Sequence, residues 1–224
     1  MPTISIANPK GGSGKSTSSL VLGTTLARQD ASVAIIDADP NQPLLHWSKG
    51  QTKNRAKIIG NVTEDKIIDV IDNAAVENQF VFVDLEGTAS RMVSRAFSRS
   101  DIVLIPLQPS AVDASQAAKA IKLIREEEKV LRRNIPHRLL FTRTSPQIKT
   151  RNEKMIVSEL DQNAVPTFEN HLNQRVAFQS VFTYRLDLWE LEPALVNGLV
   201  AAQQNATNLA LELIATLKFE QAKG

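Results

Sequence analysis

Hydrophobic runs alternate with helix-like stretches along the whole chain of 224 residues. Most of these runs are apolar at every position rather than at every second one, as expected for parallel strands covered on both faces. From this pattern we predict strands at residues 3–7, 32–37, 80–84, 102–106 and 138–142. We predict helices at residues 17–27, 64–77, 88–98, 114–131, 151–163, 175–183 and 193–219.

Regular strand–helix alternation predicts an α/β fold with a doubly wound, mostly parallel sheet and helices on both faces. The length suits one domain with a sizeable core. The chain has no internal repeat, linker or low-complexity segment, so we expect a single domain over residues 1–224.

The composition of the chain limits the kinds of site and the cellular compartment that it can have. The chain has no cysteine, which excludes disulfides and cysteine metal sites and fits a reducing cytoplasm. No apolar stretch approaches the roughly 18 residues that a membrane span needs. The chain enters its first predicted strand directly, so we expect no secretory signal and a cytoplasmic protein.

A glycine-rich loop joins the first predicted strand to the first predicted helix. Glycines lack a Cβ, so their backbone N–H groups can approach an anion closely, and the helix dipole adds attraction at the same place. Lys15 is placed to reach the β- and γ-phosphates of a nucleotide, and the Ser16 hydroxyl to bind Mg²⁺. We expect the cofactor-binding loop to comprise Lys10, Gly11, Gly12, Ser13, Gly14, Lys15, Ser16 and Thr17.

Acidic residues follow two of the predicted strands, at the edge where such sheets bind ligands. Asp84 follows four apolar residues, which is the Walker B arrangement for holding Mg²⁺. Asp37 and Asp39 close another strand just before Pro40. Capping of a turn is the alternative role for these aspartates.

Lys10 gives the loop a second lysine, and Pro9 stands where the ordinary pattern has a glycine. The run from Lys10 to Ser16 resembles the deviant Walker A loop, K-G-G-x-G-K-[ST], of the ParA/MinD family of P-loop NTPases. The resemblance implies ATP and Mg²⁺ as ligands and a weak ATPase activity. It also implies that Lys10 reaches across a dimer interface to phosphates bound by the other subunit.

The segment from Asp37 to Asn41 resembles the family's D-x-D-P-Q segment, with Asn41 in place of glutamine. The resemblance implies that Asp37 supports the water shell of the metal and that Asp39 positions the attacking water. The implied metal site comprises Ser16, Asp37 and Asp84. The implied catalytic residues are Lys10, Lys15 and Asp39.

Other segments are similar to the short, ParF-type plasmid members of the family: residues 8–15, 44–49 and 105–110. The likeness spans roughly residues 1–145. It implies that Pro109 borders the nucleotide and that the base lies near Arg143. The chain lacks an N-K-x-D sequence, which disfavours GTP. Glu86 departs from the family pattern; it either senses the γ-phosphate region or caps the next helix, and we expect the cap.

Positive charge is concentrated after the loop. Residues 113–154 carry 11 basic and 5 acidic side chains, although the net charge of the chain is only +2. Such clusters favour the phosphates of DNA without regard to sequence. We expect DNA contacts from Lys149, Arg151, Lys154 and Arg175. For residues 119–133 the alternative is a solvated helix face with i,i+4 pairs. A separate alternative places the DNA contacts at Arg175 and Arg185.

The resemblance implies a DNA partition ATPase. It would form a nucleotide-sandwich homodimer on ATP, bind non-specific DNA on the nucleoid, and be reset by slow hydrolysis that a DNA-bound ParB/ParG-like adaptor stimulates. Alternatives are a MinD-like or cargo-positioning ATPase, a conjugative-transfer accessory ATPase, and a dethiobiotin-synthetase-like ligase. Near the C-terminus Lys218 and Lys223 stand against Glu212 and Glu220, so we expect no membrane partner.

Overall fold

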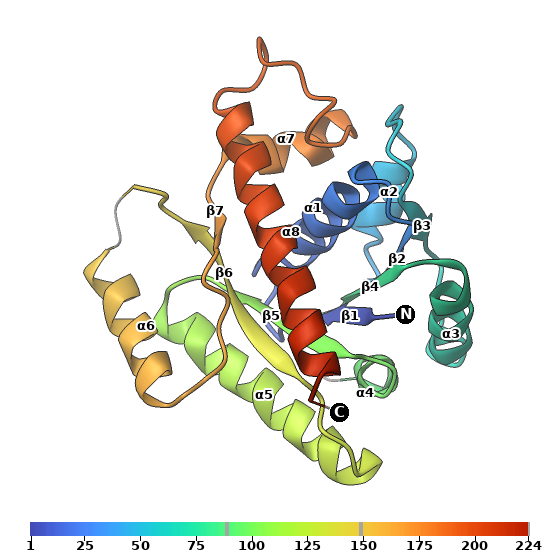
Figure 1. The fold of residues 1–224 in the computed structure, drawn as a ribbon, viewed down its shortest axis with the longest axis vertical. Helices are drawn as coiled ribbons and strands as arrows, with labels where there is room; N and C mark the ends of the chain where they lie inside the picture. Colours follow the sequence, from blue (N-terminus) through green and yellow to red (C-terminus); the bar gives the residue numbers. More distant parts are fainter. Residues whose placement is uncertain (88–89, 148–149, 224) are drawn as a thin grey trace.

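A seven-stranded sheet lies between two layers of helices in the computed structural model, which describes residues 1–87, 90–147 and 150–223 (Figure 1). The strands are β1 (Thr3–Ile6), β2 (Val33–Ala38), β3 (Lys57–Ile59), β4 (Phe80–Leu85), β5 (Ile102–Leu107), β6 (His137–Thr144) and β7 (Leu172–Asn173). The helices are α1 (Lys15–Arg28), α2 (Pro43–Ser48), α3 (Ile67–Glu77), α4 (Arg91–Phe97), α5 (Ala111–Leu131), α6 (Arg151–Gln162), α7 (Val176–Tyr184) and α8 (Leu199–Gln221).

The strands are ordered β3-β2-β4-β1-β5-β6-β7, and each of these neighbouring pairs is parallel. The predicted fold class is therefore confirmed. Strand β1 lies near the middle of the sheet, between β4 and β5. Because all strands run the same way, the loops that follow them gather at one edge of the sheet, which is where ligands bind in folds of this kind.

Two hydrophobic cores explain why the strands are apolar at nearly every position. Ile35 of β2 belongs to a core shared with α1, α2, α7 and α8. Its neighbours Ala34 and Ile36 belong to the opposite core, shared with α3, α4, α5 and α6. Successive side chains of a strand point to opposite faces, so a sheet covered on both sides buries them all.

Several elements differ from the prediction. Strands β3 and β7 and helix α2 were not predicted; they contain three, two and six residues, too few for a hydrophobic period to show. The last helix was predicted from residue 193 but begins at Leu199, because Gly198 adopts a left-handed conformation with φ of 70° and ends a series of turns. Among the described residues, no helix is both long and apolar enough to span a membrane.

The end of α2 and the segment after it form hydrogen bonds with the segment that follows α7. The indole Nε1 of Trp47 donates to the carbonyl of Leu186 at 3.2 Å. The hydroxyl of Thr52 donates to Glu190 at 2.6 Å, and the amide of Asn54 donates to Asp187 at 2.7 Å. These bonds connect the end of α2 and the residues before β3 to the segment that follows α7.

Candidate functional site

The loop between β1 and α1 has the backbone of an anion-binding loop. Gly12 and Gly14 have φ values of 72° and 103°, which a residue with a Cβ adopts only with strain. Gly14 also lies against Thr142, where an added Cβ would come within 3.1 Å of the threonine methyl. Helix α1 starts immediately afterwards without a side-chain cap, so the N–H groups of its first turn face outward.

The loop borders a hollow of about 400 Å³, here called the loop hollow. Six of the eight predicted loop residues line it: Gly11, Gly12, Gly14, Lys15, Ser16 and Thr17. Asp39, Glu86 and Arg143 line it from three other strand ends. Ser13 instead faces inward: it is buried, and its carbonyl accepts a hydrogen bond from the Thr142 hydroxyl at 2.7 Å.

Lys15 is a buried cation at the base of the loop hollow. Its Nζ donates to the carbonyl of Lys10 at 3.3 Å, which holds the side chain back along the loop. Burial lowers the pKa of Lys15, against the opposing influence of the carboxylates of Asp84, Asp39 and Glu86. A lysine that is poorly solvated and faces an open hollow gains from an anionic ligand there.

Asp37 and Asp84 are paired in register on the adjacent strands β2 and β4, and both are buried. The pKa of Asp84 is raised to about 7, chiefly by burial and also by the charges of Asp37 and Asp39, while the Ser16 hydroxyl and Lys15 lower it. Burial likewise raises the pKa of Asp37, against backbone hydrogen bonds that lower it. Two buried carboxylates this close are costly to ionise together when no metal ion is bound beside them.

These carboxylates fit a magnesium ion. Among the described residues, Oδ1 of Asp37 and Oδ2 of Asp84 are buried without hydrogen-bond partners, and Ser16 lies close enough to Asp84 to lower its pKa. Mg²⁺ prefers oxygen ligands and usually shares them between one or two carboxylates, waters and phosphates. Among the described residues, no group of three or more histidine, cysteine or acidic side chains is arranged to hold a metal ion by itself, so phosphate oxygens and water would have to complete the coordination.

The two aspartates at the end of β2 have different surroundings. Oδ2 of Asp37 accepts hydrogen bonds from the backbone N–H groups of Leu44 and Leu45, both at 2.8 Å, so Asp37 also caps α2. Oδ1 of Asp39 accepts from the backbone and side-chain nitrogens of Asn41 at 2.8 and 3.0 Å. One carboxylate oxygen of each aspartate therefore has the turn-capping role that was the alternative to metal or water binding. Asp39 also lines the loop hollow.

Lys10 does not line the loop hollow. Its Nζ forms an ion pair with Oδ2 of Asp113 at 2.6 Å, and Asp113 is almost fully buried at the start of α5. Burial alone would raise the pKa of Asp113, but hydrogen bonds from Lys10, Ser110 and the Gln108 backbone lower it. The extra lysine is thus held on the β5–α5 side of the loop.

Glu86 lines the loop hollow, and our expectation that it caps the following helix is wrong. Helix α4 starts at Arg91, and the hydroxyl of Ser90 accepts from the Val93 N–H in the cap position. The predicted start of this helix, residues 88–89, lies outside the described residues. Gly87 lets β4 approach the loop: a Cβ there would lie 3.1 Å from the carbonyl of Pro9.

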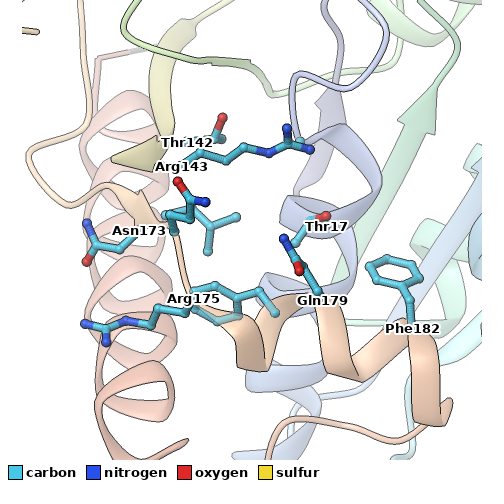
Figure 2. Close-up of a pocket in the computed structure, with 11 residues that line it drawn as sticks. Thr17, Thr142, Arg143, Asn173, Arg175, Gln179 and Phe182 are labelled. Atoms are coloured by element: carbon cyan, nitrogen blue, oxygen red, sulfur yellow. The ribbon is translucent and has the colours of Figure 1, made fainter. Parts of the chain in front are cut away.

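A second hollow of about 260 Å³, here called the side hollow, adjoins the loop hollow. Gly14, Thr17 and Arg143 line both. Figure 2 shows the Arg143 side chain extending toward α1 and Thr17, while Gln179 and Phe182 reach in from α7. An aromatic ring, amides and an apolar wall next to a phosphate-type loop suit a nucleobase. That the base lies near Arg143 stays a prediction, and the contributions of α7 were not predicted.

Pro109 lies in the turn between β5 and α5, outside both hollows. The neighbouring Gln108 makes the contact with the loop, because its Nε2 donates to the carbonyl of Gly12 at 3.3 Å.

Two residues that support the site were not predicted from the sequence. Asn8 donates to the carbonyl of Pro106 at 2.6 Å and accepts from the Lys10 N–H, and the Ser19 hydroxyl donates to Asp84 at 3.2 Å. Their nearness to Lys10 and Ser16 in sequence was the available signal.

The basic residues are less concentrated than their sequence positions indicate. Arg138 pairs with Glu220 at 2.6 Å, and the Arg133 guanidinium donates to the carbonyls that end α4. Arg151 and Lys154 are exposed on α6, whereas Arg175 lies at the start of α7; Lys149 lies outside the described residues. The structure therefore places the predicted DNA contacts on two separate elements.

Known proteins share both the sequence pattern and the fold. Residues 4–184 match the family described as the CobQ/CobB/MinD/ParA nucleotide binding domain. The chain belongs to this family. Protein ParA of Rhizobium radiobacter is 39% identical over 218 residues, which cover 97% of this chain and 98% of that protein.

Solved structures show the same fold at low identity. A Cyanothece McdA–ATP complex is 14% identical, with a TM-score of 0.74 over 95% of this chain and 96% of its own. A plasmid partition protein from Borrelia burgdorferi B31 bound to AMPPNP is 17% identical, with a TM-score of 0.67 over 94% and 98%. At these identities the likeness concerns the P-loop NTPase-like ParA/MinD fold.

The buried charge of Asp84 should cost stability when no metal is bound. The pKa of this carboxyl is raised on folding, so the folded chain binds its proton more tightly, and stability falls as pH rises from the unfolded value toward 7. Without Mg²⁺, Asp84→Asn should raise the free energy of unfolding at about pH 8 by up to about 4 kcal/mol, with little change at about pH 4.

Urea denaturation at the two pH values, with EDTA present, measures this difference. Asp69→Asn serves as the control, because Asp69 is exposed on α3 and should change stability little at either pH. An Asp84→Asn effect of equal size at both pH values would show that the buried charge is not its cause.

Proposed function

We propose that this chain is an ATP-dependent DNA partition ATPase. It binds ATP with Mg²⁺, dimerises, holds DNA without sequence preference, and is reset by slow hydrolysis. One observation carries the proposal: Lys10 stands at a complete phosphate-type loop yet lies outside the hollow of its own subunit. A cation in this position is available to phosphates bound by a second subunit. The likeness to ParA of Rhizobium radiobacter over nearly the whole chain supports a partition role.

Each residue of the loop hollow has a definite task in this proposal. The backbone N–H groups from Gly11 to Thr17 and the Lys15 ammonium bind the phosphates. The Ser16 hydroxyl and the Asp84 carboxylate would hold Mg²⁺ with support from Asp37, and the ion would neutralise phosphate charge. The side hollow receives the adenine base between Arg143 and α7.

Asp39 is the residue that orients the attacking water. Its carboxylate lines the loop hollow opposite Lys15, and its two hydrogen bonds from Asn41 fix the direction of the side chain. A carboxylate in that position accepts a hydrogen bond from water and directs its lone pair at the γ-phosphorus.

Lys10 must leave Asp113 before it can cross the interface. In the single chain the pair is tight, since Asp113 is buried and also accepts from Ser110 and Gln108. The triphosphate of the other subunit is the competing anion. ATP therefore favours the dimer, and loss of the γ-phosphate returns Lys10 to Asp113. A DNA-bound adaptor on the nucleoid would act on the closed dimer.

Binding to random-sequence duplex DNA tests the proposed function. We expect DNA binding with ATP and Mg²⁺ and much weaker binding with ADP or without nucleotide. The affinity should fall steeply as salt increases, because DNA phosphates release counterions on binding. Fluorescence anisotropy at several salt concentrations measures both effects. Absence of DNA binding in every nucleotide state would contradict the proposal and direct attention to membrane or protein cargo.

Lys10→Ala should separate nucleotide binding from dimerisation. Because Lys10 lies outside the loop hollow, the variant should bind ATP with an affinity within about threefold of the unmodified protein, a change of less than about 1 kcal/mol. It should remain monomeric with ATP in light scattering. Lys66→Ala, which removes an exposed lysine at the start of α3, should dimerise normally. An unchanged ATP-dependent dimer in Lys10→Ala would remove Lys10 from the interface.

A further inference from the structure

Helix α2 connects the end of β2 with the end of α7. Its first turn is capped by Asp37, whose Oδ2 accepts from the N–H groups of Leu44 and Leu45. Its last turn holds Trp47, which is 2% exposed and donates through Nε1 to the carbonyl of Leu186 at 3.2 Å. A helix of only six residues therefore joins a carboxylate of the predicted metal site to the segment that follows α7.

Gly50 lets the two segments lie backbone against backbone. A Cβ at this position would lie 2.3 Å from the carbonyl oxygen of Arg185, a separation that Cβ atoms do not tolerate. Arg185 ends α7 with a left-handed φ of 55°, so the chain turns just before the bond from Trp47. The contact of Trp47 and Gly50 with Arg185 and Leu186 is here called the helix junction.

Helix α7 also forms one wall of the side hollow. Phe178, Gln179 and Phe182 line this hollow, and Figure 2 shows Gln179 and Phe182 reaching in from α7. Phe182 belongs to the last turn of α7, and Leu186 of the helix junction follows one turn later. When the side hollow is filled, the last turn of α7 has less freedom, and the junction is restricted with it.

The turn between β2 and α2 carries Asp39. The Gln42 N–H donates to the Asp39 carbonyl at 2.9 Å, and the His46 N–H donates to the Gln42 carbonyl at 3.0 Å. The turn is thus tied to the start of α2 as well as to the end of β2. A displacement of α2 therefore moves Asp39 together with the Asp37 carboxylate that caps this helix.

We infer that Trp47 is a positioning residue that couples the side hollow to the two aspartates at the end of β2. The inference rests on the nucleotide binding and hydrolysis proposed above and adds a connection between the two hollows. With the side hollow filled, α7 holds the Leu186 carbonyl in place, Trp47 fixes α2, and α2 sets the aspartates. Groups that orient metal and water ligands in this indirect way affect activity strongly. Turnover thus depends on an occupied side hollow as well as on phosphates in the loop hollow.

The fluorescence of Trp47 tests the coupling without turnover. The chain has two tryptophans, so Trp189→Phe leaves Trp47 as the one indole that reports. In this variant, saturating ADP with EDTA should shift the emission of Trp47, because the base restricts α7. Trp47 is not among the described residues that line the side hollow, so direct contact with the base would not cause the shift. Inorganic tripolyphosphate with EDTA occupies the loop hollow alone and should leave the emission unchanged.

Two substitutions in the helix junction test its effect on hydrolysis. Trp47→Phe removes the indole N–H but keeps an aromatic ring, and Gly50→Ala adds a Cβ that forces the backbones apart. Each should lower kcat for ATP by about three- to tenfold, as expected when about one hydrogen bond no longer holds α2 in place. The affinity for ATP should stay within about threefold. Trp189→Phe, which changes a half-buried tryptophan nearby, is the matched control and should retain kcat.

Thermal denaturation verifies that each variant is folded. Equal emission shifts from ADP and tripolyphosphate, or no shift from bound ADP, would overturn the inference while leaving the proposed ATPase intact. An unchanged kcat in both junction variants, or a loss of ATP affinity as large as the loss of kcat, would also overturn it, because Trp47 would then serve packing alone. Absence of nucleotide binding and hydrolysis in the unmodified protein would instead overturn the proposed function and this inference together.

Discussion

The burial of Asp37 and Asp84 at the ends of two adjacent strands is the constraint on which the rest of the site depends. The parallel register of β2 and β4 places the two carboxylates side by side, and both are shielded from water. Burial raises the pKa of both carboxyls, and one oxygen of each has no hydrogen-bond partner among the described residues. Lys15, the Ser16 hydroxyl and the open N–H groups of α1 surround the same point. The arrangement becomes favourable when a cation and a polyanion enter together, which is what Mg²⁺ with a triphosphate provides.

The buried strands and the glycine-rich loop could be predicted, because both follow from patterns over a few consecutive residues. Continuous apolar runs mark buried parallel strands, and glycines at Gly12 and Gly14 mark a loop that needs positive φ. The pairing of Lys10 with Asp113 could not be predicted, since the residues are 103 apart in sequence and meet only because β5 lies next to β1. The role of α7 in the side hollow likewise depends on tertiary placement, whereas the cap of α4 by Ser90 is a local feature of the sequence.

Two hollows adjoin at the carboxyl ends of the strands, and the proposed nucleotide would span both. In the proposed function the loop hollow receives the phosphates and the metal, and the side hollow receives the base. Gly14, Thr17 and Arg143 line both hollows, so the two parts of the proposed nucleotide site share a wall.

The Mg²⁺ dependence of ATP binding tests the central claim most directly. Calorimetric titration of ATP into the unmodified protein and into Asp84→Asn, each with Mg²⁺ and with EDTA, measures it. The account predicts that Mg²⁺ strengthens ATP binding in the unmodified protein by about tenfold or more, and that Asp84→Asn loses most of this gain, since one ligand of the ion is gone. An equal gain from Mg²⁺ in both proteins would contradict the assignment of the buried carboxylates to the metal.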